Sequence, residues 1–288
     1  MLTRRTSERR FFLRPDSFIT QLFLYALGWA AERFNIGIVC VVVMSNHWHA
    51  VVIDHDAKLP RFVAKVHLTV AKCVNVFRGR WENVWASGRY NAVRLMTADD
   101  VLDRIVYVLA NPVRAALVET AAEWPGLLLG PGLRTVDTLE AMRPTLWFRK
   151  RGRTPRSAAL VLLKPACFDH LSDEAFEELV AKRLEKVERE VAAALVLEDR
   201  QPLGADAVLE QDWRDAPKTE APRRVRHPHI AARDDDLRVV AIRELQQFYV
   251  DHERARCRWT RGRRRTRFPA GTYLMRVRYR VTCHPPPG

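Results

Sequence analysis

The sequence predicts an α+β fold in which one antiparallel sheet packs against helices. The apolar run Ile36–Met44 is followed, after a short turn, by a second apolar run, Trp48–Ile53, so the two runs predict a β-hairpin. Stretches with a helical spacing of bulky residues precede and follow this hairpin. With 288 residues, 48% of them hydrophobic, the chain can bury a sizeable core.

The remaining elements of the first 125 residues follow from short local signals. Apolar or alternating residues predict two more strands, and capping residues and helical periodicity predict three helices. The strands are expected at Phe11–Pro15 and Tyr90–Leu95, and the helices at 17–34, Leu59–Phe77 and from Thr97 to the Asn111-Pro112 break. The β-branched run Ile36–Met44 indicates a strand that is covered on both faces. The resulting order β-α-β-β-α-β-α resembles a ferredoxin-like sandwich, with helices on one face of the sheet.

The second half of the chain has a different composition. We expect a first domain at residues 9–125, a basic linker at 126–170, and a mainly helical, basic extension at 171–288. Helices are predicted at Ser172–Leu197 and Leu237–His252. The segment from Arg254 to Arg280 contains eleven arginines and no acidic residue.

The charge balance indicates a polyanionic partner. A net charge of +14 favours nucleic acid first and an anionic membrane surface second. No apolar run approaches the length of a transmembrane helix, and no signal peptide is expected. The five cysteines form no CxxC pair, which indicates a reduced, cytoplasmic setting, in association with the nucleoid if the partner is DNA.

The motif MSNHWHAVV, Met44–Val52, places two histidines at the start of the second hairpin strand. Because side chains alternate along a strand, His47 and His49 share one face and Trp48 points to the other. Two imidazoles at this spacing can hold one divalent cation, and burying them without partners would be costly. The alternative is that both are ordinary polar residues at the edge of a hairpin.

Tyr107 lies on the polar side of its predicted helix, opposite the apolar stripe, and Asn111 follows four residues later on the same side. A phenol with a pKa near 10 is a poor nucleophile at neutral pH. A neighbouring cation that polarises a phosphodiester would compensate, and the tyrosine could then form a covalent phosphotyrosine. The alternative is an amphipathic tyrosine on a surface helix.

These motifs together resemble a known family. MSNHWHAVV resembles the HUH motif, histidine–hydrophobic–histidine, of single-tyrosine transposases. YVLANPVRAALV, Tyr107–Val118, and the preceding RYNAVRL, Arg89–Leu95, resemble the tyrosine helix and its preceding strand in the REP-associated tyrosine transposases. The resemblance covers about residues 9–125, and the C-terminal half departs from the compact family pattern.

The resemblance implies an HUH nuclease domain that cuts single-stranded DNA beside a hairpin, such as a REP-like palindrome. By this resemblance Tyr107 is the nucleophile, and His47, His49 and Asn111 bind Mg²⁺ or Mn²⁺, with Asp54 or a water as a further ligand. The products would be a 5′-phosphotyrosine and a free 3′-OH. Relatives work as monomers or homodimers.

Basic residues are the candidate DNA contacts. In the C-terminal segment they are interleaved with aromatic residues, a pattern that suits phosphate contacts combined with base stacking. A basic tail without a specific role is the alternative for that segment. The candidates are Arg89, Arg94, Arg104, Arg114, Arg261, Arg263, Arg264, Arg265 and Arg267.

Two other functions remain open from the sequence. The same fold could be a catalytically inactive regulator that binds DNA hairpins. An unrelated metal hydrolase would use His47, His49 and Asp54 and would not need Tyr107. Tyr90 is a less favoured nucleophile, because it lies on a strand and lacks an asparagine partner.

Overall fold

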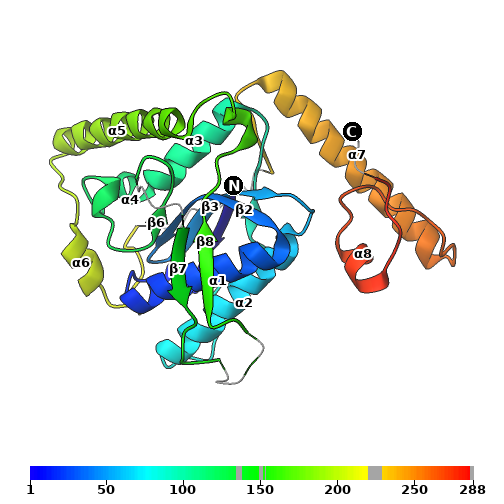
Figure 1. The fold of residues 1–288 in the computed structure, drawn as a ribbon, viewed down its shortest axis with the longest axis horizontal. Coiled ribbons are helices and arrows are strands. Elements are labelled where there is room, and N and C mark those ends of the chain that lie inside the picture. The colour runs from blue at the N-terminus through cyan, green and yellow to red at the C-terminus, as the bar shows by residue number, and fades with distance from the viewer. Residues whose placement is uncertain (134–137, 149–151, 153, 220–228, 286–288) are drawn as a thin grey trace. The chain divides into compact units, whose positions relative to one another are not determined.

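The computed structural model describes residues 1–133, 138–148, 152, 154–219 and 229–285 (Figure 1). The chain forms two compact units, Met1–His229 and Ile230–Gly288. This division differs from the boundaries expected near residues 125 and 170. Within the described residues, no helix combines the length and the apolar character that a membrane crossing requires.

The first unit is built around an antiparallel sheet with the strand order β4-β1-β3-β2-β6. The predicted hairpin is confirmed as β2 and β3, and a strand that the sequence did not predict, β1, pairs with β3. The five strands are β1 (Leu2–Arg5), β2 (Ile36–Met44), β3 (His47–Asp54), β4 (Asn91–Ala92) and β6 (Leu128–Leu129).

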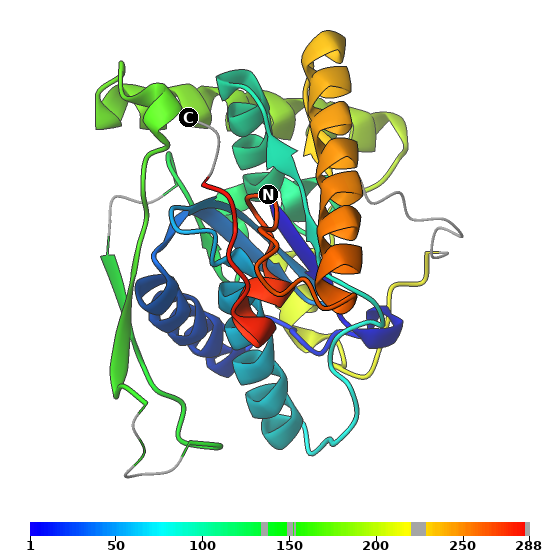
Figure 2. The same cartoon turned by 90° about the vertical axis from the view of Figure 1, so that its right-hand side faces the viewer.

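Two helices cover one face of this sheet, α1 (Ser17–Phe34) and α2 (Leu59–Phe77). Both match the predicted ranges. They pack on each other and bury an apolar cluster that includes Trp48 and the alternate β2 residues Val41 and Val43. Figures 1 and 2 show both helices on the same side of the sheet.

The opposite face is covered by α3 (Ala98–Leu109), and α5 (Asp173–Leu197) packs on α3 from outside. The expectation of helices on one face only is therefore wrong. The chain needs the second layer because the other side chains of β2, such as Val42 and Met44, are also apolar and buried. The prediction that β2 is covered on both faces is confirmed. A break in pairing between Ile38 and Cys40 shifts the alternation of β2.

The expected linker contains a β-hairpin, β7 (Thr138–Met142) and β8 (Ser157–Val161), which packs on α1. The approach is close, because a Cβ on Gly28 would lie 2.5 Å from the carbonyl oxygen of Ala159. Residues 134–137, 149–151 and 153 of this segment lie outside the described residues. The smaller elements of the first unit are η1 (Ser7–Arg9), β5 (Arg94–Leu95), α4 (Asn111–Arg114), η2 (Ala121–Glu123), η3 (Ala166–Phe168) and α6 (Ala205–Glu210).

The second unit consists of β9 (Ile230–Ala231), the long helix α7 (Asp235–Thr260) and the short helix α8 (Leu274–Tyr279). The helix predicted at Leu237–His252 is thus two turns longer at its C-terminal end. A small core formed by Ala255, Phe268, Met275 and Val281 joins α7 to the segment that follows it.

Two predicted strands differ from the structure. Phe11–Pro15 is not a strand; Phe12 and Leu13 are buried in the α1 and α2 core, and a turn runs through this segment. The strand expected at Tyr90–Leu95 is reduced to the two-residue strands β4 and β5. The first strand of the sheet is β1 instead, and it lies between β4 and β3.

Candidate functional site

The start of β3 presents both histidines on the sheet face that α3 covers. The ring centroids of His47 and His49 lie 4.8 Å apart. Trp48 points to the opposite face, where it is buried against Phe23. The predicted alternation is therefore confirmed, and the two imidazoles form a pair rather than two separate surface residues.

Helices α3 and α4 bring the other two predicted residues to this pair. The ring centroid of Tyr107 on α3 lies 5.6 Å from that of His49. Asn111, the first residue of α4, places its Oδ1 atom 3.2 Å from Nε2 of His47. Tyr107 is half-buried and Asn111 is buried. The structure thus brings together all four residues that the sequence analysis assigned to one site.

The position of α3 follows from its sequence. A capping box starts the helix: Thr97 Oγ1 accepts a hydrogen bond from the backbone N–H of Asp100, and the Asp100 carboxylate accepts one from the N–H of Thr97. Apolar residues such as Ile105 and Leu109 pack on the sheet. This packing fixes the rotation of the helix, so that Tyr107 faces β3.

Two residues at the site were missed by the sequence analysis. Thr3 Oγ1 lies 2.7 Å from Nδ1 of His49, because β1 pairs with β3 in a register that sets Thr3 opposite His49. Asn46 Oδ1 lies 2.6 Å from Nδ1 of His47. Asn46 lies within the motif, directly before His47, and could have been suspected. Thr3 could not, since nothing in the sequence reveals that β1 lies beside β3.

Burial keeps both imidazoles neutral. Desolvation lowers the pKa of His47 to about 4; the contact with Asn111 opposes this shift, and the charges of Arg5 and Arg9 add to it. Desolvation and the neighbouring His47 hold the pKa of His49 well below its usual value. A neutral imidazole is the form that binds a metal ion, so the pair is ready to act as a ligand at neutral pH.

The donor set at His47 fits a cation. A neutral imidazole carries one N–H, yet both of its ring nitrogens face an amide oxygen, of Asn46 and of Asn111. When Nδ1 donates to Asn46, the Nε2 lone pair and the Asn111 oxygen face each other. Either an amide group turns over or a cation lies between them. Imidazole nitrogen and amide oxygen are suitable ligands for a divalent ion such as Mn²⁺.

Other candidate ligands are engaged elsewhere. Both carboxylate oxygens of Asp54 accept backbone hydrogen bonds at the start of α2, from Lys58 at 2.8 Å and from Leu59 at 2.9 Å. This engagement argues against Asp54 as a third ligand. In the part of the chain that the structure describes, no three His, Cys, Asp or Glu side chains form a metal-binding group. A ligand set here would consist of two imidazoles and an amide.

Tyr90 lies away from this site. It packs against the apolar cluster of α1 and α2, and its ring centroid lies 6.2 Å from that of His67. Tyr107 packs against the cluster on the opposite face of the sheet. Of the two candidate nucleophiles, only Tyr107 is beside the histidine pair.

The predicted basic contacts of the first unit differ in their distance from the site. The guanidinium of Arg104 lies 5.8 Å from the ring of Tyr107. Arg114 is exposed on α4, and Arg89 and Arg94 are exposed near β4 and β5. Arg104 is therefore the predicted arginine whose guanidinium lies within cation–π distance of the candidate nucleophile.

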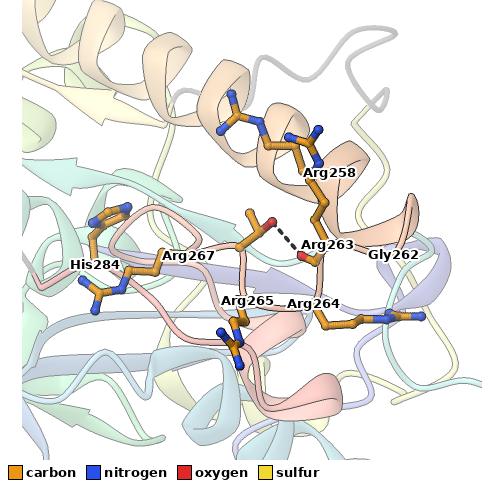
Figure 3. Close-up of a pocket in the computed structure, with 8 residues that line it drawn as sticks. Arg258, Gly262, Arg263, Arg264, Arg265, Arg267 and His284 are labelled. Carbon is orange, nitrogen blue, oxygen red and sulfur yellow. Dashed lines mark hydrogen bonds between the residues drawn. The ribbon is translucent and has the colours of Figure 1, made fainter.

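In the second unit, arginines surround a hollow of about 710 Å³ (Figure 3). Four predicted residues line it: Arg263, Arg264, Arg265 and Arg267. The sequence analysis missed two further lining residues, Arg258 on α7 and His284; Figure 3 shows the side chain of His284 near that of Arg267. Arg261, also predicted, is exposed just after α7.

Aromatic contacts support this arginine hollow. The guanidinium of Arg264 lies 3.9 Å from the ring centroid of Trp259, which is itself paired with Tyr279 at 5.2 Å. Such a cation–π contact holds an exposed arginine in place without neutralising its charge. The segment therefore holds its arginine side chains in fixed positions, and the hollow that they line is positively charged.

No family model, no curated protein and no solved structure matches this chain.

Proposed function

We propose that the chain is a metal-dependent endonuclease and strand transferase that acts on single-stranded DNA beside hairpins, of the REP-associated tyrosine transposase type. The observation that carries this proposal is the convergence of two neutral histidines, an asparagine and a half-buried tyrosine at one end of β3. Its setting would be the cytoplasm, in association with DNA, as a monomer or a homodimer.

The order of elements along the chain supports this proposal. A ferredoxin-like unit runs strand–helix–strand–strand–helix–strand. The elements β1, α1, β2, β3, α2 and β4 follow one another in this order and form one sheet, with α1 and α2 on one face and β6 added at the edge. The histidine pair then lies on a central strand, where the backbone is held by both neighbours.

His47, His49 and Asn111 would hold Mg²⁺ or Mn²⁺, which would polarise the scissile phosphodiester and offset its charge. Tyr107 attacks the phosphorus through its phenolic oxygen. The P–O3′ bond breaks, the 3′ oxygen leaves as a free 3′-OH after taking a proton, and the tyrosine keeps the 5′-phosphate. The phenolic proton passes to water. Attack by a 3′-OH on the phosphotyrosine reverses these steps and joins DNA ends.

The arginine hollow of the second unit would bind the DNA backbone. Each phosphate contact releases counterions, so affinity depends on salt. Arg265→Ala should weaken DNA binding similarly for all sequences and reduce the salt slope by about 0.7 if one contact to a single-strand phosphate is lost. Arg256→Ala is the matched control, because the charge of Arg256 is already neutralised by an ion pair with Glu253 at 2.7 Å.

The decisive experiment is a covalent adduct assay on hairpin-bearing single strands with Mn²⁺. Wild-type protein should give a denaturation-resistant protein–DNA adduct that maps to Tyr107, and Tyr107→Phe should give none. The matched control is Tyr90→Phe, which should still form the adduct. His49→Ala should lose metal-dependent cleavage and keep salt-sensitive DNA binding.

Two outcomes would overturn the proposal. Hairpin binding without any adduct, under all metals tried, would favour a regulator that only binds DNA. Cleavage that persists in Tyr107→Phe would favour a metal hydrolase.

A further inference from the structure

A second hollow, of about 360 Å³, lies in the first unit between β1, α2 and the segment 81–88. Its lining includes Arg4, Asn75, Trp81, Glu82 and Trp85. Arg4 pairs with Trp48 across the β1–β3 ladder, so it belongs to the sheet face opposite the histidine pair. The hollow is therefore separate from the candidate catalytic site, although both adjoin β1.

The two tryptophans that line the hollow differ: Trp85 is held by contacts with His67, and Trp81 is exposed. Trp85 is fixed, because its Nε1 donates a hydrogen bond to the carbonyl of His67 at 2.9 Å and its ring lies 4.7 Å from the His67 ring. Trp81 is 87% exposed. So large an exposed indole gains little from burial within this chain, and its flat surface is open for stacking.

The polar groups at the hollow suit a ligand with both charge and hydrogen-bonding edges. Arg4 donates to the carbonyls of Gly88 at 3.0 Å and Ala86 at 2.7 Å, and it makes no ion pair with a carboxylate among the described residues. Asn75 donates to the carbonyl of Glu82 at 2.9 Å, while its Oδ1 atom is buried without a hydrogen-bond partner in the described chain.

We propose that this hollow binds an unpaired nucleobase of single-stranded DNA. Bases stack on aromatic side chains whatever their sequence, and an amide can read a base edge. The Glu82 carboxylate can accept a hydrogen bond from the exocyclic amino group of a base. Because this carboxylate repels anions, a free phosphate would bind less well than a base. The volume is within the range of small-ligand sites. The inference deepens the proposed function, because it takes single-stranded DNA as the substrate.

The position of the base pocket in the fold also indicates where the bound base would lie relative to the scissile phosphate. Thr3 and Arg4 are neighbours on β1, and their side chains point to opposite faces of the sheet, Thr3 to His49 and Arg4 to the pocket. A DNA strand that passes around the short edge strand β4, which pairs only with Leu2 and Thr3 of β1, would present one base to the tryptophans while its backbone continues toward Tyr107. The pocket would then help to select which phosphate is cut.

The test measures binding without cleavage. A fluorescein-labelled, hairpin-bearing single strand is titrated with full-length protein in EDTA, and each unpaired position is replaced in turn by an abasic residue. Trp81→Ala should weaken binding about tenfold, which is the scale expected for one lost stacking contact. One abasic position should weaken wild-type binding similarly and cause no further loss in Trp81→Ala.

The control is Trp147→Ala, which removes another partly exposed tryptophan of the same unit; it should bind like wild type. Trp81→Phe should restore most of the affinity, and thermal melting checks that Trp81→Ala is folded. Two results would show that the pocket does not bind a base. The first is that Trp81→Ala binds the strand as tightly as Trp147→Ala does. The second is that every abasic position weakens binding by Trp81→Ala as much as it weakens binding by wild type. If Trp81→Ala does not fold, quenching of wild-type tryptophan fluorescence by the strand, absent with the abasic strand, decides instead.

The two proposals can fail separately. If wild-type protein forms no adduct but Trp81→Ala still weakens DNA binding, the nuclease proposal is overturned and the base pocket remains. An adduct at Tyr107 without any Trp81 effect would overturn the base pocket alone.

Discussion

Thr3 is a positioning residue whose contribution can be isolated. Its Oγ1 lies 2.7 Å from Nδ1 of His49, and the tautomer in which Nδ1 donates to Thr3 leaves the Nε2 lone pair available for a metal ion. Thr3→Val keeps the shape of the side chain and removes this partner. Loss of such a contact typically lowers metal affinity 10- to 100-fold, or about 1.4 to 2.7 kcal/mol. The fold should lose only about 1 kcal/mol, because one hydrogen bond disappears.

The assay is a Mn²⁺ titration followed by electron paramagnetic resonance, together with the rate of adduct formation at saturating DNA. Both should fall in Thr3→Val, and added Mn²⁺ should recover part of the rate. Thr3→Ser keeps a hydroxyl at the same position and should behave like wild type. Equal Mn²⁺ affinity in Thr3→Val and Thr3→Ser would refute the reasoning, since the hydroxyl would then have no role in orienting His49.

Three further predictions concern folding and ligand choice. Gly28→Ala should lower the free energy of unfolding by about 1–2 kcal/mol in urea, because the new Cβ would meet the backbone of Ala159; an unchanged value would contradict the packing of the β7–β8 hairpin on α1. Asp54→Ala should cost about 1 kcal/mol, because the N–H groups of Lys58 and Leu59 at the start of α2 lose their acceptor, and it should leave Mn²⁺ affinity unchanged; a lost Mn²⁺ site would favour the hydrolase. Burial lowers the pKa of His47 to about 4 and of His67 to about 3, so below pH 6.5 the unfolded chain binds protons that the folded chain does not. The melting temperature should therefore fall from pH 6.5 toward pH 4, and this fall should be smaller in His67→Gln.

Local signals predicted the central elements well. The ranges of α1 and α2 and the β2–β3 hairpin follow from apolar periodicity, and the Thr97 capping box marks the start of α3. The alternation at His47 and His49 follows from strand geometry alone. These features depend on residues close in sequence, so the sequence is sufficient to predict them.

The remaining features depend on partners distant in sequence. LTRR at β1 is polar and basic and has no strand-like pattern, and it becomes a strand because it pairs with β3. The apolar Phe11–Leu13 suggested that strand instead, but these residues fill the core as part of a turn. Thr3 as a partner of His49 follows only from the β1 register. Strand pairing over such a distance is set by tertiary packing, which overrides local preference.

The register of β1 has one more consequence. Thr3 lies opposite His49 and Arg4 lies opposite Trp48, so a slip of one residue would set Arg4 against His49. A permanent cation would then lie where the neutral hydroxyl of Thr3 now meets the imidazole of His49, and the base pocket would lose the guanidinium of Arg4 at the same time. Inserting a single residue between β1 and the α1 helix therefore threatens two surfaces at once, whereas a substitution at either position disturbs one.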